Sequence, residues 1–405
     1  MVSIAIMGHG VVGSGVAEIF TTHKQKLYAS IGEEVYVKKI LDLREFPDSP
    51  LADRFTKNFE DIINDLEIRV VVEVMGGLNP AYDFVKRCLK AGKSVVTSNK
   101  ELVAAHGAEL LEISKETNTN FLFEASVGGG IPIIRPLCQC LAANYIEGIA
   151  GILNGTTNFI LTMMIEKGMS FDEALKIAQE KGYAEKDPTA DVEGHDACRK
   201  VCILASLAFG KHVYPNQVET EGITNITLED VSYIENAGGV IKLLGQIKYI
   251  NDNEIAAFVS PAVVYNGSQL ASVKDVFNAI LVRGDAVGDV CFYGPGAGKL
   301  PTASAVVADI IDCAKHSERK KIFGWGAGNE DYVVDYKERI EMPFYVRAKA
   351  TPAEINAKFS DVKFLSRKGQ PSDEVAFITD IMTENKLNKK LDGINVINTI
   401  KVTNY

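Results

Sequence analysis

The feature that most constrains the fold is a glycine-rich turn close to the start of the chain. An apolar run, VSIAIM, leads directly into Gly8-His9-Gly10-Val11-Val12-Gly13, and AEIF follows at helical spacing. In the pattern G-x-G-x-x-G, the first glycine permits a tight turn, the second lets a pyrophosphate approach the backbone, and the third lets strand and helix pack closely. The amides that open the helix then face the phosphates. The motif alone is weak, but its position between a strand and a helix predicts a dinucleotide-binding unit.

Strands and helices alternate through the first part of the chain. Strand-like runs occupy residues 35–43, 70–74, 94–97 and 121–126, and residues 81–91 have helical spacing. This alternation predicts a doubly wound, mostly parallel sheet. We therefore expect a Rossmann-type dinucleotide-binding domain over residues 1–126, completed by residues 297–314.

The pattern changes after residue 126. Residues 147–153 have the pattern of a strand, whereas 159–168, 171–182 and 196–210 have helical spacing, the second of these with Ser170 as its N-cap. This mixture predicts an α+β domain over residues 127–296, which we expect to bind substrate and to dimerise. Residues 315–342 are charged and contain glycine, which predicts a linker. Residues 343–405 follow the order βαββαβ, a ferredoxin-like unit.

Composition limits the partners and the location. Hydrophobic residues make up 46% of the 405 and charged residues 24%, as in an ordinary soluble globular protein. The net charge is −10 without any basic run, which argues against a nucleic acid or an anionic membrane as partner. The first apolar run lacks the features of a signal peptide, and no stretch approaches the roughly 18 apolar residues of a membrane span. We therefore expect a cytoplasmic protein.

Cysteine usage argues against a disulfide framework. The chain is large and its cysteines are seven, an odd number. Cys198 and Cys202 share a helix face, and Cys138 and Cys140 suggest a strand or turn, but neither pair has partners at zinc-site spacing. We expect buried thiols that act as small apolar residues.

Asp42 is the candidate for recognising the ribose of the dinucleotide. It ends the second strand, where a carboxylate accepts both ribose hydroxyls and favours NAD. It lies 29 residues beyond Gly13, farther than usual, which fits an extra segment at 22–34. Arg44, with Lys38 and Lys39, offers a 2′-phosphate site instead. The choice between NAD and NADP stays open, as does the alternative that Asp42 is simply a solvated strand end.

The densest polar cluster runs from residue 182 to residue 196 and opens an apolar helix. It reads GYAEKDPTADVEGHD and leads into ACRK. Asp196 and Lys200 are spaced i, i+4 and share a helix face, and Glu185 lies in the loop before them. Most such pairs are solvated surface pairs, but a lysine buried in an apolar helix requires a reason. Carboxylates can bind an ammonium group and a hydroxyl, while the lysine exchanges a proton at the reacting oxygen.

Three further segments carry candidate ligands. Ser98 and Lys100 follow the fourth strand at the carboxyl end of the sheet, where ligands of open α/β sheets bind. The alternative interpretation is that Ser98 and Lys100 lie in a surface loop that starts a helix and bind no ligand. Asn154-Gly155-Thr156 lies between a strand and a helix, where it either caps the helix or contacts substrate. Gly128-Gly129-Gly130 lets backbone carbonyls turn toward a ligand or cation.

Taken together, these segments resemble the homoserine dehydrogenase family. The matching stretches occur in the family's order between residue 4 and about residue 311: GHGVVGSGV, TSNKELVA, EASVGGGIPIIRPL, ILNGTTNFILTMM, GYAEKDPTADVEGHDACRK and YGPGAGKLPTASAVVADI. The stretch from GYAEKDP to DACRK is the most specific. The C-terminal unit resembles an ACT domain, as in the longer monofunctional members.

The resemblance implies an activity and the residues that perform it. The activity is the reversible NAD(P)H-dependent reduction of L-aspartate 4-semialdehyde to L-homoserine, in the biosynthesis of threonine, methionine and isoleucine. Lys200 is implied as the proton donor to the aldehyde oxygen, and Lys100 as the residue that holds substrate and cofactor near the reacting carbon. Glu185 and Asp196 are implied to bind the substrate's amino and hydroxyl ends. Asn154, Gly155 and Thr156 are implied to line the pocket.

The same resemblance implies cofactor and cation ligands. Gly298, in GPGAG, is implied to return to the nicotinamide side of the cofactor. A monovalent-cation site, usually for sodium, is implied at Glu124, Val127, Gly129 and Ile131, largely through backbone carbonyls. The family forms dimers or tetramers, so a homo-oligomer is implied here.

Two departures from the family pattern qualify these implications. Leu41-Asp42-Leu43-Arg44 stands where members often have Arg-Asp, which leaves NADP preference open. ACT domains that bind amino acids often have Asp-x-x-Gly after their first strand, but residues 348–354 (AKATPAE) contain no glycine. The C-terminal unit is therefore either an L-threonine sensor or an assembly module without an effector.

Two rival functions remain at this stage. One is a regulatory binding protein that has lost catalysis, which the set of Glu185, Asp196, Lys200 and Lys100 argues against. The other is a reductase for a different amino-acid aldehyde. The stretches NGTTNF and GYAEKDP argue against that alternative, because they match the homoserine pocket rather than a general nucleotide fold.

Overall fold

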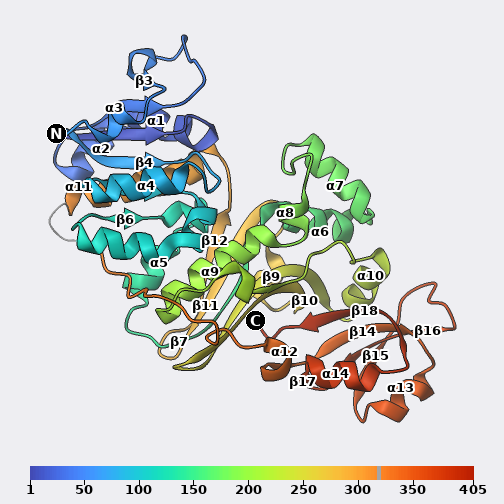
Figure 1. Ribbon diagram of the computed structural model, residues 1–405. Helices are drawn as coiled ribbons and strands as arrows, with labels where there is room; N and C mark the ends of the chain where they lie inside the picture. The colour runs from blue at the N-terminus through green and yellow to red at the C-terminus, as the bar shows by residue number, and fades with distance from the viewer. Residues whose placement is uncertain (317–320) are drawn as a thin grey trace. The chain divides into compact units, whose positions relative to one another are not determined.

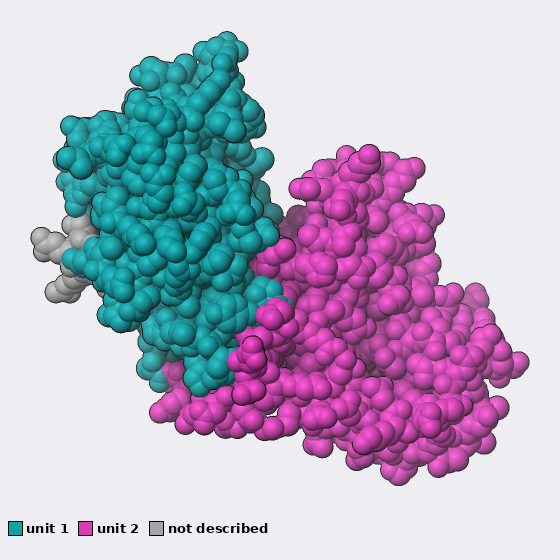
Figure 2. Space-filling model, in the orientation of Figure 1, with its two compact units in different colours: residues 1–143, 202–215, 294–329 teal, residues 144–201, 216–293, 330–405 magenta. Residues whose placement is uncertain are grey.

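The computed structural model describes residues 1–316 and 321–405. The chain divides into two compact units. Unit 1 comprises residues 1–143, 202–215 and 294–329, and unit 2 comprises residues 144–201, 216–293 and 330–405 (Figure 2). Within the described residues, no helix is both long and apolar enough to cross a membrane.

Unit 1 is built on a six-stranded parallel sheet of order β3-β2-β1-β4-β5-β6 (Figure 1). β1 is buried along its whole length, as a central strand covered on both faces must be. This order is that of a dinucleotide-binding Rossmann fold, so the predicted doubly wound parallel sheet is confirmed. The strands are β1 (Val2–Met7), β2 (Val35–Leu41), β3 (Phe55–Thr56), β4 (Ile68–Glu73), β5 (Ser94–Thr97) and β6 (Phe121–Leu122).

Helices of unit 1 come from both ends of the sequence. The helices of the N-terminal part are α1 (Val11–Thr22), α2 (Lys24–Ile31), α3 (Glu60–Ile63), α4 (Ala81–Lys90) and α5 (Lys100–Glu116). α2 fills the extra segment between the glycine turn and β2. α11 (Lys299–Lys315) packs against α1, and its Ala303, Val306 and Ile310 are fully buried in the same hydrophobic core as β1. Residues far along the chain therefore complete this unit.

The predicted strand at 121–126 is shorter than expected. β6 ends at Leu122, and Glu124–Ser126 forms a 3₁₀ turn. The backbone turns here because the buried Glu124 binds two distant segments: its N–H donates to Asp309, and its carboxylate accepts the N–H groups of Ile133 and Ile134. The sequence prediction was wrong for residues 123–126, since these partners are not local.

The cysteines differ from the prediction of buried thiols at Cys140 and Cys291, which are exposed, and at Cys138, which is only partly buried. Cys198 and Cys202 are buried on α9 (His195–Phe209), as expected. Cys138 and Cys140 lie in a π-helical turn, Pro136–Cys140, and Cys140 is exposed. The expectation of a buried thiol at Cys140 was wrong, because this turn lies at the surface.

Unit 2 is built around a mixed sheet in which β7, β9, β10 and β11 pair antiparallel. These strands are β7 (Ile146–Ile152), β9 (Gly239–Asn251), β10 (Glu254–Tyr265) and β11 (Phe277–Gly284); β12 (Gly288–Pro295) flanks β11, and β8 (Glu219–Thr220) pairs with β10. α6 (Gly155–Lys167) packs on β9 and β11, and α10 (Leu228–Asn236) packs on β9. β9, β11 and α10 had no clear signal in the sequence.

Three more helices of unit 2 surround the polar cluster. α7 (Phe171–Glu180) begins at Ser170, whose hydroxyl forms a reciprocal capping box with Glu173, which confirms the predicted N-cap. α8 (Thr189–Val192) is a single turn. α9 begins in unit 2, and the division between the units falls after Val201.

The C-terminal residues adopt the predicted βαββαβ order. The elements are β14 (Phe344–Lys349), α13 (Pro352–Lys358), β15 (Val362–Leu365), β16 (Glu374–Thr379), α14 (Glu384–Leu391) and β18 (Asn395–Val402). Their strand order, β18-β14-β16-β15, is ferredoxin-like, and β18 pairs in parallel with β10, so these strands continue the sheet of unit 2. α12 (Tyr336–Arg339) and β13 (Glu341–Met342) lie within the expected linker 315–342, of which residues 317–320 are outside the described residues.

Candidate active site

The glycine turn between β1 and α1 allows no side chain at two of its positions. Gly8 has φ +99°, where L-residues are strained, and a β-carbon there would lie 2.9 Å from the carbonyl oxygen of Val74. A β-carbon at Gly13 would overlap the carbonyl oxygen of Gly8. A β-carbon at Gly10 would meet nothing within 4 Å, so this position opens onto free space at the N-cap of α1. This distribution matches the three roles that the motif predicts.

Asp42 follows β2 and is already engaged by two neighbours. Its carboxylate accepts the backbone N–H of His9 at 2.8 Å and two guanidinium N–H groups of Arg44 at 3.0 and 2.8 Å. These bonds, led by the Arg44 side chain, hold the pKa of Asp42 well below its usual range. The Asp42 side chain is 9% exposed and that of Arg44 is 63% exposed. Asp42 is therefore an ionised group held in place, and most of the Arg44 side chain is open to solvent.

A cavity of about 280 Å³ lies beside Asp42 and Arg44. Phe46 and Phe55 lie in its wall with their rings stacked at 4.8 Å. Lys57 also lines it and forms a 2.8 Å ion pair with Glu45. The sequence reasoning missed Phe46, Phe55 and Lys57, because they are dispersed through an irregular loop without a motif.

The carboxyl ends of β4 and β5 hold a buried polar network. Thr97 donates to Glu73 at 2.6 Å, and Thr97 in turn accepts the N–H of Asn99. The Asn99 side chain caps α5 by accepting the N–H of Leu102. Burial raises the pKa of Glu73. Ser98 and Lys100 flank Asn99 and are half-buried, so the network fixes the backbone that presents them.

Unit 2 contains a buried lysine bound to a carboxylate. Lys200 is 7% exposed, and its ammonium donates to the Asp196 carboxylate at 2.8 Å and to the carbonyl oxygen of Leu153 at 2.6 Å. Asp196 is 5% exposed. The predicted pair therefore lies inside the protein, one turn apart on α9, with its third partner at the end of β7. A buried ion pair of this kind is costly to build and gives weak evidence for stability alone, so a functional role is favoured.

Asn154 connects this pair to two other segments. Its amide donates to Asp196 at 2.9 Å and to Asp191 at 2.7 Å, while its oxygen accepts the N–H of Thr157 and caps α6. Asp191, in α8, is a site residue that the sequence reasoning did not assign, although it lies within the predicted cluster. The only available signal was its place between Glu185 and Asp196.

The neighbours of Asn154 have fixed positions as well. A β-carbon at Gly155 would lie 2.7 Å from the carbonyl oxygen of Val276, which leaves no room for a side chain. Thr156 donates to the carbonyl of Tyr183 at 2.7 Å. Glu185, by contrast, is exposed in the loop after α7, where its carbonyl accepts from Gln179 at 3.1 Å. The structure thus brings Asn154, Asp196 and Lys200 together, and gives Glu185 a place at the surface.

The loop after β6 presents backbone carbonyls. Both oxygens of the Glu124 carboxylate are occupied by N–H groups of Ile133, Ile134 and Arg135 at 2.7 to 2.9 Å. Gly129 has φ +57°, and a β-carbon there would overlap the carbonyl oxygen of Gly296. Gly298 has φ +117° and is the N-cap of α11. Over residues 1–316 and 321–405, the carbonyl oxygens of Val127, Gly129 and Ile131 accept no hydrogen bond.

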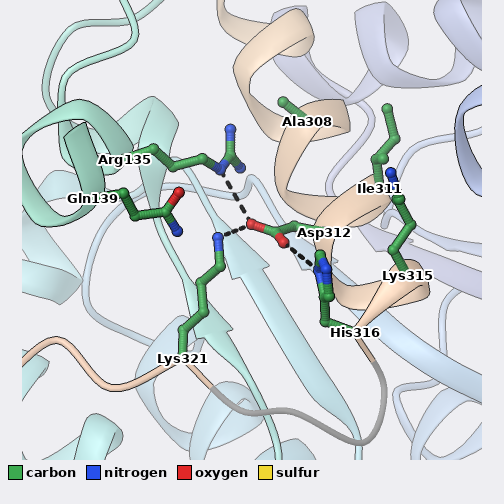
Figure 3. A pocket seen from close by; sticks show the side chains of 8 residues that line it. All are labelled: Arg135, Gln139, Ala308, Ile311, Asp312, Lys315, His316 and Lys321. Atoms are coloured by element: carbon green, nitrogen blue, oxygen red, sulfur yellow. Dashed lines mark hydrogen bonds and ion pairs between the residues drawn. The ribbon is translucent and has the colours of Figure 1, made fainter.

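A charged cavity of about 490 Å³ lies elsewhere in unit 1 (Figure 3). Asp312 is at its centre and accepts from Arg135 at 3.2 Å, from His316 at 2.9 Å, and from Lys321. Arg135 also pairs with the fully buried Asp309, whose pKa burial raises to about 7. None of the predicted site residues lines this cavity, so its size does not identify the active site.

The fold and these side chains define a class of enzyme. A Rossmann-type unit with the glycine turn accounts for a dinucleotide, and the other unit contains a buried lysine–carboxylate pair, a type of group that can exchange a proton. This combination is that of a nicotinamide-dependent oxidoreductase.

Comparison with known proteins identifies the family. The model of the homoserine dehydrogenase NAD-binding domain matches residues 8–124, and the homoserine dehydrogenase model matches residues 132–311. The homoserine dehydrogenase of Bacillus subtilis is 43% identical over 318 residues, which is 78% of this chain and 73% of that protein. The enzyme of Corynebacterium glutamicum is 42% identical over 335 residues, 81% and 74% of the two chains.

Solved structures agree with the sequence matches. A homoserine dehydrogenase from Thiobacillus denitrificans superposes with a TM-score of 0.88 at 36% identity, over 99% of this chain and 98% of that one. A hyperthermophilic archaeal homoserine dehydrogenase in complex with NADPH has a TM-score of 0.67 at 29% identity, over 78% of this chain and 98% of its own. The chain therefore belongs to the homoserine dehydrogenase family of NAD(P)-dependent oxidoreductases, which confirms the resemblance found in the sequence.

Proposed function

We propose that the protein reduces L-aspartate 4-semialdehyde to L-homoserine reversibly, with Lys200 as the proton donor to the aldehyde oxygen. The observation that carries this assignment is the buried ammonium of Lys200, held by Asp196 and by the carbonyl of Leu153. The products of this reaction serve the biosynthesis of threonine, methionine and isoleucine.

The chemistry follows from the charge that develops during reduction. When bound, a nicotinamide cofactor would supply the hydride that the aldehyde carbon takes up. Negative charge then grows on the aldehyde oxygen, and the Lys200 ammonium stabilises that oxygen and transfers a proton to it. Asp196 holds the ammonium by an ion pair, and Asn154 holds Asp196, so the proton donor is oriented before the substrate arrives.

The substrate contacts extend the same centre. Asp196 binds the hydroxyl end of the substrate, and Glu185 binds its amino group after moving inward from its exposed loop. Asn154, Gly155 and Thr156 line the pocket, since they surround the N-terminus of α6. Lys100, at the start of α5 in unit 1, holds substrate and cofactor near the reacting carbon.

The turn from Gly8 to Gly13 would hold the dinucleotide, and the residues that line the cavity of about 280 Å³ would hold its adenosine end. The Asp42 carboxylate would accept the ribose hydroxyls of NADH, whereas Arg44 and Lys57 would bind the 2′-phosphate of NADPH. The pairing of Arg44 with Asp42 supports use of both cofactors, because it neutralises the carboxylate that would otherwise repel a phosphate. Ser98 and Gly298 complete the cofactor contacts toward the nicotinamide.

The carbonyls of the loop after β6 fit a monovalent cation. Val127, Gly129 and Ile131 are buried, and a buried carbonyl without a donor is satisfied by water or a cation. The Glu124 carboxylate is fully used by backbone amides, so Glu124 contributes its carbonyl oxygen. We propose sodium as the cation, and it would stabilise the loop that ends at Gly130. The N–H of Gly130 donates to the carbonyl of Pro295.

The C-terminal strands act as an ACT-like module that assembles a homodimer or homotetramer. The ferredoxin-like strand order supports this role. The turn between β14 and α13 contains Thr351 in a capping box and Pro352, without a glycine. L-threonine binding at this turn is therefore the less favoured of the two roles.

A turnover assay tests the proposal. The purified protein is supplied with L-aspartate 4-semialdehyde, with NADH or NADPH, and with sodium or potassium, and oxidation of the nicotinamide is followed by absorbance. We expect turnover with both nucleotides. Absence of turnover in a folded sample with either nucleotide would move the assignment to another aldehyde or to a binding protein.

The variant Arg44→Ala sharpens the cofactor assignment. Removal of a charge-assisted bond of about 1.5 to 3 kcal/mol should lower kcat/KM for NADPH by about tenfold or more, with little change for NADH. An equal loss for both nucleotides would contradict the role of Arg44. Adding L-threonine in the same assay tests the effector.

A further inference from the structure

Residues 219–227, which begin with β8, contact two functional parts of unit 2, and we call this segment the strap. It runs from Glu219 to Thr227, the N-cap of α10. The strap is fixed to the sheet through β8 and through the N–H of Glu221, which donates to the carbonyl of Val259 on β10 at 2.8 Å. Its two sides meet different neighbours.

One side of the strap packs against the turn that precedes α9. The N–H of Ile223 donates to the carbonyl of Val192 at 2.9 Å. Thr224 donates to the Glu193 carboxylate at 3.2 Å. A β-carbon at Gly222 would overlap the carbonyl oxygen of Val192 and lie 2.6 Å from the Cα of Glu193. The strap and this turn are therefore in backbone-to-backbone contact, and only glycine permits that approach.

The contacted turn is joined directly to the lysine centre. Asp191 and Asp196 lie on either side of Val192 and Glu193, and the Asn154 amide donates to both carboxylates. Asp196 holds Lys200 at 2.8 Å. A displacement of Val192 and Glu193 must therefore move the groups that orient the Lys200 ammonium.

The other side of the strap is bound by the C-terminal strands. Lys401 of β18, 5% exposed, forms a 3.0 Å ion pair with Glu221. Asn398, also on β18, donates to the carbonyl of Asn225 at 3.2 Å. Arg347 of β14 donates to the Thr227 hydroxyl at 3.0 Å. Three side chains of the C-terminal strands thus hold the strap along its length.

We infer that the strap is a positioning device through which β14 and β18 set the geometry of the lysine centre. Gly222, Glu221 and Lys401 are positioning residues: they touch neither substrate nor cofactor, and they act through the turn at Val192 and Glu193. This inference rests on the proposed role of Lys200. It gives the C-terminal strands a part in catalysis that requires no effector.

A pair of glycine variants tests the close approach. Gly222→Ala forces the strap and the turn apart, and a displacement of about 1 Å lowers kcat by up to about 100-fold. Gly267→Ala is the matched control in the same unit, since its β-carbon would meet nothing within 4 Å. We expect Gly222→Ala to lower kcat and to shift the pH profile of kcat, with the dissociation constant for NADPH unchanged. An unshifted pH profile with kcat near that of Gly267→Ala would overturn the inference.

Variants of the ion pair test the link to β18. Lys401→Arg keeps the charge and Lys401→Met removes it, so we expect near-normal kcat from the first and a several-fold loss from the second. Lys401 also pairs with Glu384 at 3.4 Å, so the double variant is compared with Lys401→Met alone: adding Glu221→Gln should cause no further loss, because its contact with Lys401 is already broken. Additive losses, or equal kcat in Lys401→Arg and Lys401→Met, would overturn the link. Normal turnover in Lys200→Met would instead disprove the proposed role of Lys200, on which this inference rests.

Discussion

The two units present their functional groups in different ways. In unit 1 the glycine turn is local: Gly8, Gly10 and Gly13 leave out side chains, and in our proposal the backbone of this turn binds the nucleotide. In unit 2 the lysine centre is assembled from the end of β7, from α8 and from the start of α9, and it depends on buried charges that hold one another. A local turn is fixed by steric fit, whereas an assembled centre is fixed by a chain of hydrogen bonds. The two should therefore fail differently when altered.

The largest effect is expected at Lys200. Lys200→Met removes the proposed proton donor at similar volume, so kcat should fall by about 10² to 10⁴-fold, the usual contribution of a general acid. Lys274→Met is the matched control, since Lys274 is an exposed lysine of unit 2 paired with Glu166. The kcat of both variants is measured in the steady-state oxidation of homoserine. A Lys200→Met enzyme with near-normal kcat would remove this residue from the mechanism.

A pair of substitutions in the glycine turn separates folding from nucleotide binding. Gly13→Ala places a β-carbon against the carbonyl of Gly8, and such overpacking should lower the free energy of unfolding by about 1 to 3 kcal/mol. Gly10→Ala has free space in the protein but obstructs the pyrophosphate, so thermal stability should hold while NADPH affinity falls at least about tenfold. Urea unfolding and calorimetric titration measure the two quantities. Identical behaviour of the two variants would contradict the distinct roles of the glycines.

Substitutions at Asn154 test whether the charges of the lysine centre depend on one another, because the Asn154 amide contacts both Asp191 and Asp196. Asn154→Asp keeps a cap for α6 but places a third carboxylate beside Asp191 and Asp196, which raises their pKa values. We expect a loss of about tenfold in kcat/KM for homoserine, partly recovered as the pH rises. Asn154→Ser keeps the cap without the added charge and serves as control. If the two variants had the same pH profile, the charge coupling would be refuted.

The smallest effect at neutral pH is expected from His212 in unit 1. This buried ring accepts a hydrogen bond from Trp325 at 3.1 Å, and burial lowers its pKa to about 4. An unfolded histidine binds a proton near pH 6.5, so stability is complete above that pH and is lost as the pH falls toward 4. At about 1.4 kcal/mol for each pKa unit, the loss reaches about 3 kcal/mol.

His212→Gln should flatten this dependence, because glutamine offers both hydrogen bonds without titrating. His23→Gln, at an exposed histidine, is the control. Urea unfolding at neutral pH and at about pH 5 gives the comparison. An unchanged slope of stability with pH in His212→Gln would show that another group controls acid sensitivity.

The sequence predicted the parts of the molecule that depend on local rules. The glycine turn, the parallel strands of unit 1 and the capping box at Ser170 each follow from neighbours along the chain. The pair Asp196 and Lys200 could be found because helical spacing alone places the two residues on one face. The βαββαβ order of residues 343–405 was predicted for the same reason, since the apolar residues of each element repeat with the spacing of a strand or of a helix.

The remaining features depend on partners distant in sequence. The strand ended at Leu122 rather than Ser126 because Glu124 binds Asp309 and the amides that begin at Ile133. Asp191 joined the site only through Asn154, and Lys57 through the cavity beside Asp42. The strap at Gly222 carried no motif, because its requirement for glycine arises from contact with Val192. Contacts of this kind appear only once the chain is folded.

The central claim is that nucleotide binding and proton transfer are separate properties of separate structures. Calorimetric titration of NADPH into Lys200→Met tests it most directly. We predict a dissociation constant within about twofold of the wild type, a difference of roughly 0.4 kcal/mol, although turnover is lost. A collapse of NADPH affinity together with turnover, in a variant that unfolds at the wild-type temperature, would contradict the claim and make Lys200 part of the nucleotide site.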